Sequence, residues 1–304
     1  MLKLESKINI KVVSVGNRGC NVLERLNKLK KNGVEFCAIS KAGKAFNGLR
    51  IENKIELPYS FDLDHNKNID KMAKSVVNEK QKEIIELARG TDIVFFVCNL
   101  ANKASVLQTK EIAQTFKKTG SLVFFVGATP FHFEGKIRRE LVEKARKDLN
   151  KEVDALLIID NEKVAKREIS ANEAFTQVDS IVSGVIDSIL DIIIKEGIIN
   201  IDFADLKTIV QNSGETFFNN STGSKKEIVT VINNLFSKSN LSIQKNSFSK
   251  VLYVIYAGKN LLTNEVKQIG EKIHQKTRGN EKIIFGIVED KKMKDKLKIV
   301  MIGS

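Results

Sequence analysis

The feature that most limits how this sequence folds is a series of short apolar runs separated by segments of helical length. Strands that are covered on both faces of a sheet read as nearly continuous apolar runs, and the covering helices come between them. The pattern therefore predicts a parallel, Rossmann-like sheet in the first half of the chain. The runs span residues 8–15, 34–40, 92–98, 121–129 and 153–160.

Helices are expected between these strands, over residues 21–31, 70–88, 106–118 and 136–148. The chain between the second strand and about residue 70 is a long polar stretch to which no strand or helix is assigned. Pro130 marks a loop rather than the interior of a strand, because proline cannot donate a hydrogen bond to a neighbouring strand.

A strongly apolar segment follows from Ala171 to Lys195, with apolar residues at helical spacing and Gly184 as the interruption. Because apolar residues lie on more than one side, we expect this helix to be buried nearly all round. The chain beyond it predicts a smaller α/β domain, with strands at 250–258, 281–290 and 296–304 and a helix at 265–277. The expected domains are a Rossmann-like domain over 1–170, a central core helix over 171–195 and a C-terminal domain over 196–304.

Composition argues against several classes of protein. No apolar run approaches the roughly 18 residues of a membrane span, and the N-terminal residues carry no secretory signal, so we expect a cytoplasmic protein. The three cysteines and three histidines are dispersed, which argues against a disulfide framework and a metal site. The net charge of +13 is spread along the chain beside acidic residues, so nucleic acid is not an expected partner.

Four segments in a fixed order carry the most specific signal. They are SVGNRGCN at 14–21, TPFHFEGKIRR at 129–139, ANEAFTQVD at 171–179 and GIINIDFADLKT at 197–208. Together they resemble FtsZ, the bacterial and archaeal member of the tubulin superfamily, and the likeness covers essentially the whole chain. The resemblance implies an FtsZ/tubulin-like α/β fold, with a Rossmann-like parallel-sheet N-terminal domain, a central core helix and a smaller α/β C-terminal domain. It also implies GTP or GDP as the cofactor.

The first of these segments joins a predicted strand to a predicted helix. Gly16 and Gly19 permit a tight turn there and a close approach of backbone N–H groups to an anion. The resemblance places Asn21 in the same nucleotide-binding loop. It further implies that Glu134 and Arg138 hold the ribose and the neighbouring phosphate, that Asn161 and Asp179 bind the guanine edge, and that Phe175 stacks on the base.

Simpler structural roles stand beside these functional ones. Phe175 is equally explained by packing of the long apolar helix against its surroundings. Glu134 and Arg138 are four residues apart, so they also fit an ordinary ion pair on a helix surface.

The last segment corresponds to the synergy loop, which in FtsZ reaches the γ-phosphate bound by the next subunit of a filament. Asn200, Asp202 and Asp205 occupy the matching positions and are the expected catalytic residues. Two carboxylates and an amide are able to orient a water and a cation at a phosphoanhydride. The alternative is that Asp202 or Asp205 caps the helix that begins near residue 205.

One family motif is missing. The tubulin signature GGGTGTG aligns without gaps onto Ala101–Leu107, which reads ANKASVL and contains no glycine. In the signature, glycine lets successive N–H groups turn toward the phosphates in conformations that other residues avoid, at a cost of about 1–2 kcal/mol for each non-glycine residue. We therefore expect that this loop does not keep the family's phosphate-binding shape.

The neighbouring loops are altered too, with Asn17, Arg18 and Cys20 where the family has glycines. Two interpretations follow. Cationic side chains, namely Arg18, Lys41, Lys44 and Lys103, converge and bind a phosphorylated ligand as point charges. Alternatively, bulkier side chains fill the pocket and hold the chain in one state without nucleotide, which is the interpretation we favour.

The sequence thus predicts an FtsZ-like cytoskeletal, cell-division-type protein that forms or modulates head-to-tail filaments, with GTP binding and hydrolysis weak or lost. Its expected partners are itself or a conventional FtsZ, with membrane association only indirect. The alternatives are an active GTPase with a remodelled, Lys/Arg-rich phosphate site and a nucleotide-independent scaffold on anionic membrane. An unrelated Rossmann-type enzyme is disfavoured, because the second strand runs into Lys41 rather than into an acidic ribose partner.

Overall fold

The computed structural model describes residues 8–41, 46–58, 68–164, 169–237, 239, 241, 248–277 and 282–304. The chain divides into two compact units, Met1–Gly184 and Val185–Ser304. The division falls inside a single helix, α7 (Ala171–Ile194). No helix in the described part of the chain combines the length and apolar character that crossing a bilayer requires.

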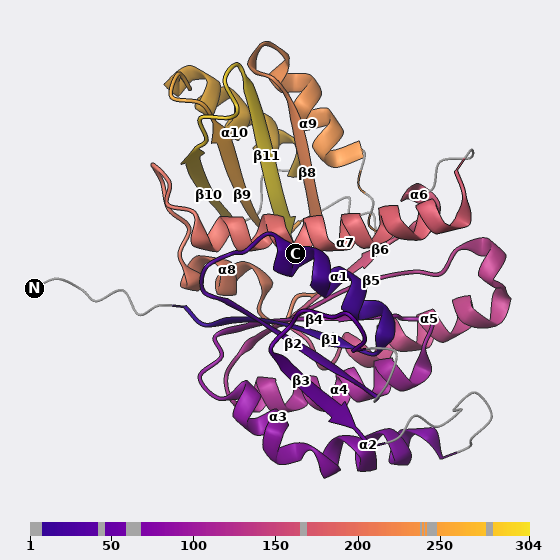
Figure 1. The fold of residues 1–304 in the computed structure, drawn as a ribbon. Coiled ribbons are helices and arrows are strands. Elements are labelled where there is room, and N and C mark those ends of the chain that lie inside the picture. The colour runs from indigo at the N-terminus through magenta and orange to yellow at the C-terminus, as the bar shows by residue number, and fades with distance from the viewer. Residues whose placement is uncertain are drawn as a thin grey trace, which may run out of the picture. The chain divides into compact units, whose positions relative to one another are not determined.

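The first unit is built on a parallel sheet with the strand order β3-β2-β1-β4-β5-β6 (Figure 1). The register places Val12 of β1 between Phe36 of β2 and Phe95 of β4, so large apolar side chains stack across the sheet. This architecture confirms the Rossmann-like prediction. The strands are β1 (Ile10–Val15), β2 (Val34–Lys41), β3 (Asn53–Leu57), β4 (Ile93–Cys98), β5 (Leu122–Ala128) and β6 (Ala155–Ile159).

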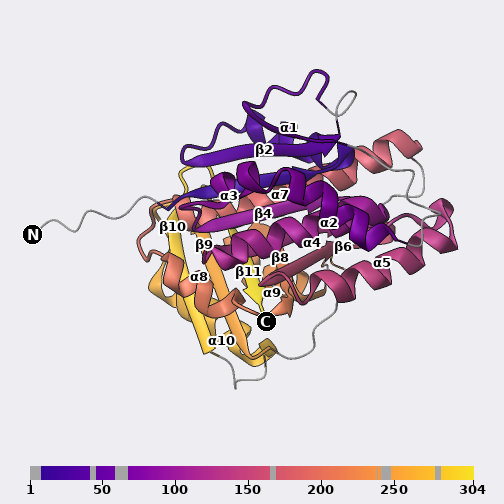
Figure 2. The same ribbon diagram turned by 90° about the horizontal axis from the view of Figure 1, so that it is seen from below.

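Helices cover both faces of this sheet. Figures 1 and 2 show α2, α3, α4 and α5 on one face and α1 on the other. Under the first group, Phe96 and Phe125 of the strands pack with Phe116 of α4 and Val142 of α5 in one buried core. The helices are α1 (Asn17–Lys28), α2 (Ile69–Glu79), α3 (Gln81–Ala88), α4 (Lys103–Lys118), α5 (Lys136–Leu149) and α6 (Asn161–Val164), with a short 3-10 turn, η2 (His132–Glu134), before α5.

Three details of the first unit differ from the sequence prediction. Strand β3 lies inside the stretch that the sequence analysis reads as polar. It was missed because only two of its five residues, Ile55 and Leu57, are buried. The helix expected over residues 70–88 is broken at Lys80, whose backbone leaves the helical conformation. Helix α7 is less completely buried than predicted, since Ala171, Asn172 and Glu173 in its first turn are exposed.

The second unit holds a four-stranded sheet in the order β10-β9-β11-β8. Strands β9 and β10 are parallel, whereas β11 pairs antiparallel with both β9 and β8. Helices α9 and α10 pack on this sheet through Ile232, Leu235 and Ile273, which meet Tyr253 and Ile299. The elements are α8 (Phe203–Val210), β7 (Gly214–Glu215), β8 (Phe217–Ser224), η3 (Lys225–Glu227), α9 (Ile228–Ser237), β9 (Lys250–Ala257), α10 (Thr263–Thr277), β10 (Lys282–Glu289) and β11 (Lys296–Gly303).

Strand β8 was not predicted. Its sequence, FFNNSTGS, carries too few alternating apolar residues to read as a strand. It forms because β11 offers a complete antiparallel partner, from Lys296 opposite Ser224 to Gly303 opposite Phe217.

Candidate functional site

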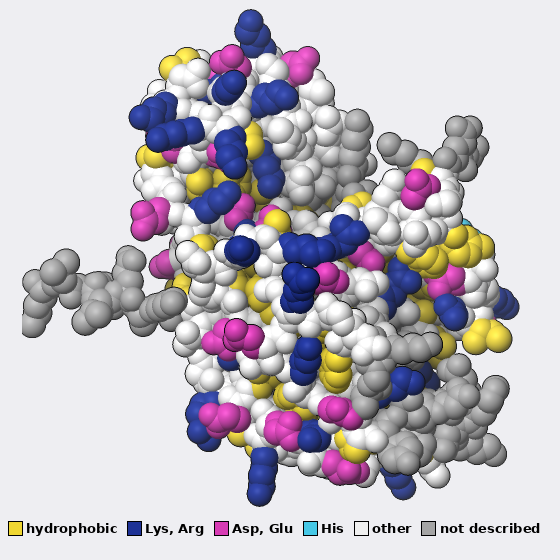
Figure 3. All heavy atoms as spheres, in the orientation of Figure 1, with side chains coloured by type: hydrophobic (Ala, Val, Ile, Leu, Met, Phe, Trp, Pro, Cys, Tyr) yellow, Lys and Arg dark blue, Asp and Glu magenta, His cyan; other side chains and the backbone are white. Residues whose placement is uncertain are grey.

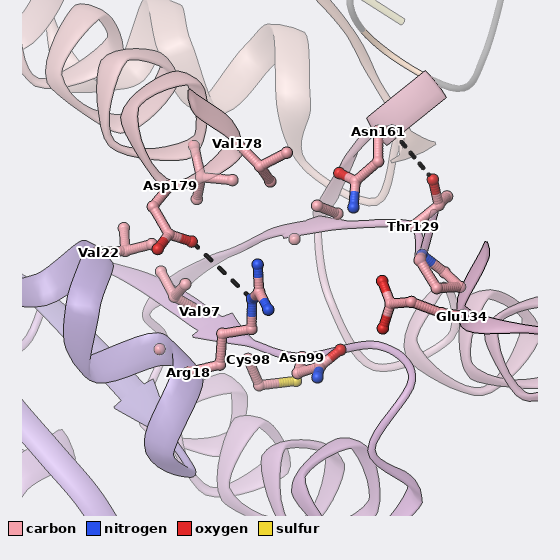
Figure 4. A pocket seen from close by; sticks show the side chains of 15 residues that line it. Arg18, Val22, Val97, Cys98, Asn99, Thr129, Glu134, Asn161, Val178 and Asp179 are labelled. Carbon is pink, nitrogen blue, oxygen red and sulfur yellow. Dashed lines mark hydrogen bonds and ion pairs between the residues drawn. The ribbon is translucent and has the colours of Figure 1, made fainter. Parts of the chain in front are cut away.

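A cavity lies where β4, β5 and β6 end, next to the point at which the strand order reverses between β1 and β4 (Figure 4). Ligands of open α/β sheets bind at this edge, outside the carboxyl ends of the strands. The cavity holds about 440 Å³, part of it open to solvent. Its lining residues are Arg18, Gly19, Val22, Val97, Cys98, Asn99, Gly127, Ala128, Thr129, Pro130, Glu134, Asn161, Val178, Asp179 and Val182.

Arg18, in the first turn of α1, reaches into this cavity (Figure 4). Its guanidinium carbon lies 4.2 Å from the centre of the Phe175 ring, and its Nε lies 3.9 Å from Oδ1 of Asp179. Phe175 and Asp179 are four residues apart on α7, which puts them on one side of that helix. A cation over an aromatic face and beside a carboxylate is held by both. Arg18 therefore covers the Phe175 ring, on which the family resemblance implies that a nucleobase stacks.

Asp179 is buried, and burial raises the pKa of its carboxyl above the ordinary value for aspartate. Arg18, a hydrogen bond from the side chain of Asn21 and the charge of Arg25 each act in the opposite direction and lower the pKa. Arg25 is itself fixed against α7 through a 3.0 Å hydrogen bond from its Nη1 to Oγ of Ser180. The predicted site residues Asn21 and Asp179 thus contact each other.

Asn161 begins α6 and is 3% exposed. Its backbone N–H donates to Oγ1 of Thr129 at 3.2 Å, which fixes the start of the helix beside the cavity (Figure 4). Its side-chain Oδ1 is buried and has no hydrogen-bond partner among the described residues. An unpaired buried acceptor is unfavourable unless a ligand or water donates to it, so this oxygen is suited to a ligand with N–H groups.

Glu134 and Arg138 form an ion pair of 2.6 Å between Oε2 and Nη1. Glu134 also accepts a hydrogen bond of 3.0 Å from the backbone N–H of Phe131, which closes the η2 turn. The rings of Phe131 and Phe133 stack with their centroids 5.0 Å apart, and each ring makes an edge-to-face contact with the ring of Phe175. The simpler structural roles considered for Glu134, Arg138 and Phe175 are therefore all present in the fold.

Gly16 and Gly19 allow the first loop to pack closely. Gly16 has φ 81, donates its N–H to the carbonyl of Ile39 at 2.9 Å, and faces the side chain of Ser105, which a β-carbon on Gly16 would overlap. A β-carbon on Gly19 would lie 2.5 Å from the carbonyl oxygen of Val97. Both glycines are accounted for by protein packing alone.

The residues that replace glycines in this loop are bonded within the protein. Asn17 accepts a 3.0 Å hydrogen bond from Oγ of Ser40, and the Cys20 thiol lies 3.6 Å from Oγ of Ser14. Burial raises the pKa of Cys20, so the thiol stays protonated. These pairs place side chains between α1 and the strands β1 and β2.

The loop Ala101–Leu107 forms an ordinary capped helix start instead of a glycine cradle. Asn102 is the N-cap of α4, and its Oδ1 accepts a 2.9 Å hydrogen bond from the N–H of Ser105. Oδ1 of Asn99 accepts a 3.0 Å hydrogen bond from the N–H of Ala101. All seven residues of the loop are described and none has a positive φ, and none lines the cavity. The expectation that the loop has lost the phosphate-binding shape agrees with this geometry.

Among the described members of the proposed cation cluster, Arg18 alone lines the cavity. Arg18 lies in the cavity, whereas Lys103 lines a separate groove on α4 and α5 with Leu141 and Lys144. Lys41 ends β2 and does not line the cavity, and Lys44 lies outside the described residues.

In the second unit, Asn200, Asp202 and Asp205 stand at the start of α8. Asp202 is its N-cap and accepts a 2.7 Å hydrogen bond from the N–H of Asp205, while Asp205 accepts one of 3.2 Å from the N–H of Asp202. Oδ1 of Asn200 accepts a 2.6 Å hydrogen bond from the N–H of Gly197. The segment is fixed to β10 by a bridge between Ile199 and Ile287. The capping role is present, and the side chains of Asn200 and Asp202 are exposed.

The sequence matches the family described as Tubulin/FtsZ family, GTPase domain, over residues 9–167, more than half of the chain. The chain belongs to the tubulin/FtsZ family. It is 28% identical to cell division protein FtsZ of Buchnera aphidicola subsp. Baizongia pistaciae, covering all of this chain and 80% of that protein. It is also 28% identical to the mitochondrial division protein fszA of Dictyostelium discoideum, covering 97% of this chain and 58% of that protein.

Solved structures of this family share the fold. An empty FtsZ dimer of M. jannaschii superposes with a TM-score of 0.83 at 22% identity, covering 99% of this chain and 89% of that one. CetZ2 of Haloferax volcanii, in a GTPγS-bound protofilament, gives 0.82 at 14% identity, covering 97% and 92%. At these identities the likeness establishes the fold alone.

A guanine nucleotide fits only part of this tubulin/FtsZ site. The unpaired Oδ1 of Asn161 and the carboxylate of Asp179 suit the donor-rich edge of a guanine. The face of Phe175 is covered by Arg18, and the N–H groups of Ala101 and Ser105 are already bonded. The site therefore lacks free amides for the phosphates at these two positions.

Two features of the site were missed from the sequence. Asn102 stands three residues before Ser105 at the start of a helical run, which is the usual signal of an N-cap, and it was read only as a lost glycine. The interpretation we did not favour gave Arg18 to the phosphates, whereas its side chain contacts Phe175 and Asp179 of α7. No local pattern marks the latter contact, because its partners are more than 150 residues away in the sequence.

Proposed function

We propose that this protein is an FtsZ-like cytoskeletal protein of the cytoplasm that forms head-to-tail filaments or joins those of a conventional FtsZ, with GTP binding and hydrolysis weak or lost. The family membership and the division proteins among its relatives support the cytoskeletal role.

The observation that carries the proposed loss of GTP binding is that backbone N–H groups of the loop Ala101–Leu107 already donate hydrogen bonds within the protein. An anion site at a helix start depends on N–H groups that point outward without a partner. Here the side chains of Asn99 and Asn102 accept the hydrogen bonds that Ala101 and Ser105 donate. A triphosphate would have to displace both asparagines before it gained these donors.

The position of Arg18 supports the same proposal from the other end of the site. A base that stacks on Phe175 must first expel a guanidinium 4.2 Å from the ring. Expulsion also separates Arg18 from Asp179 and leaves a buried carboxylate without that partner. Both changes oppose binding of a nucleobase.

The synergy segment supports a one-sided role. Asn200, Asp202 and Asp205 keep the residue types of the family, and two of them are exposed. We infer that this end docks on the nucleotide-bearing end of an intact FtsZ subunit, while the altered end does not support the reciprocal contact. Such a protein would add to one end of a filament and limit its growth.

Mixing this protein with a cognate FtsZ tests the proposal. Adding this protein at about one molecule per ten of FtsZ is expected to change the light scattering of the FtsZ filaments and their GTP turnover. A subunit that docks through only one of its ends binds at filament ends, so a small fraction is sufficient. Asp202→Asn with Asp205→Asn is the variant that should weaken the effect. Unchanged scattering and turnover at equimolar protein would contradict a role in FtsZ assembly.

A second candidate, a working GTPase with a remodelled pocket, is favoured by one observation, the unpaired Oδ1 of Asn161. A buried acceptor that faces a cavity suits a donor on a bound base. Hydrolysis of GTP by the purified protein that disappears in Asp205→Ala would select this candidate over the first.

A further inference from the structure

Three loops at one end of the second unit bring lysines together. They are η3 after β8, the connection between β9 and α10, and the turn between β10 and β11. The N–H of Lys225 donates to the carbonyl of Asp295 at 3.0 Å, and Nζ of Lys225 donates to Oδ1 of Asn260 at 2.6 Å. The three loops therefore form one continuous surface.

Six exposed lysines on this surface, here called the lysine cap, are Lys226, Lys259, Lys291, Lys292, Lys294 and Lys296. The acidic residues in these loops and at their ends are Glu227, Glu265, Glu289, Asp290 and Asp295, against the six lysines of the cap and Lys225. Asp290 is partly engaged, since its Oδ1 accepts a hydrogen bond from the N–H of Lys292. Figure 3 shows dark blue side chains gathered over this end, where the loops after β8, β9 and β10 lie in Figure 1. The surface carries an excess of positive charge.

One large apolar side chain accompanies the lysines. Leu262 is 63% exposed and lies in the same connection as Lys259. Its backbone N–H donates a hydrogen bond to Oε2 of Glu265, at the start of α10. The backbone that presents Leu262 is thus fixed, while its side chain stays in solvent. An exposed apolar residue beside several lysines is typical of segments that lie on a membrane surface.

We propose that the lysine cap with Leu262 binds the surface of a membrane that contains anionic lipids. Lysines attract anionic headgroups as separate point charges and need no defined geometry. Nucleic acid is the less suitable partner, because these three loops contain no arginine to read phosphates in pairs and no aromatic residue on which a base would stack. The contact is direct, in contrast to the indirect association of the favoured interpretation, and it gives a specific surface to the membrane alternative considered from the sequence. It does not depend on the proposed loss of GTP binding.

Sedimentation with vesicles tests this inference on the full chain. Vesicles of phosphatidylcholine with about one third phosphatidylglycerol are expected to bind the protein at low salt, and pure phosphatidylcholine vesicles are not. Raising the salt to about 0.5 M should release it, because the charges lie in solvent. Lys226→Gln with Lys259→Gln and Lys292→Gln should reduce partitioning on the order of one hundredfold, since each lysine contributes about fivefold.

A charge-matched control separates the lysine cap from net charge. Lys71→Gln with Lys74→Gln and Lys82→Gln removes three exposed lysines from α2 and α3 of the first unit and should leave vesicle binding within about threefold of the unaltered protein. Leu262→Asn should reduce binding at unchanged charge. Equal losses in both triple variants, or binding to a DNA duplex in place of vesicles, would overturn the proposal. Circular dichroism of each variant confirms that it is folded.

Discussion

At the scale of single residues, side chains that stand where the resemblance expects glycine make contacts within the protein. Arg18 binds Phe175 and Asp179, Asn17 binds Ser40, and Asn102 caps Ser105. A cation over an aromatic ring contributes about 0.5–2 kcal/mol and a side-chain cap about 1 kcal/mol. Such contacts have to be broken before a ligand gains the same groups, which is why we propose that they weaken nucleotide binding.

The buried carboxyl of Asp179 gives a prediction about pH. Its pKa is raised in the folded protein, chiefly by burial, so between the unfolded pKa near 3.9 and the folded pKa the folded state binds more protons. The contribution of Asp179 to stability is therefore full below the unfolded pKa and is lost as pH rises through the folded pKa.

Urea unfolding of the unaltered protein and of Asp179→Asn, from pH 7 down to about pH 4, measures this contribution. The free energy of unfolding of the unaltered protein should rise relative to that of the variant as pH falls. A constant difference, or one that moves the other way, would show that burial does not dominate at Asp179.

At the scale of elements, the apolar runs of the sequence were sufficient to place β1, β2, β4, β5, β6 and the three strands β9, β10 and β11. Each has enough buried residues to be recognised alone. Strands β3 and β8 were not found, because their pairing depends on a neighbouring strand rather than on their own composition. The cavity followed the same rule: Gly19, Asn161 and Asp179, which line it, were named from motifs, whereas the contacts of Arg18 with α7 depend on tertiary structure.

Helix α8 gives a prediction at this scale, because Asp202 is its N-cap and is also one of the expected catalytic residues. Asp202→Ala should lower the free energy of unfolding by about 1 kcal/mol, whereas Asp202→Asn, which keeps an acceptor, should change it by only a few tenths. Urea unfolding of the two variants measures the difference.

Asp202→Asn thereby removes the charge without removing the cap. If the two variants are equally destabilised, the carboxylate charge rather than the hydrogen bond to Asp205 stabilises the helix. If they differ as expected, Asp202→Asn is the suitable variant for studies of filament assembly.

At the scale of the whole molecule, the first unit carries a loop without glycine at Ala101–Leu107, and the second unit carries the segment that resembles the family's synergy loop, residues 197–208. The family fold is preserved over nearly the full length of the relatives' structures. The absence of glycine from Ala101–Leu107 in this fold is the reason we propose assembly that does not depend on the chain's own nucleotide.

The most direct measurement is a calorimetric titration of the protein with guanosine and, separately, with GTP and magnesium, repeated on Arg18→Gly. The comparison isolates what the triphosphate adds to binding. Because the amides of Ala101 and Ser105 are bonded to Asn99 and Asn102, we predict that GTP binds within about threefold of guanosine in both proteins, even where Arg18→Gly strengthens both. Binding of GTP on the order of one hundredfold tighter than guanosine would contradict the account.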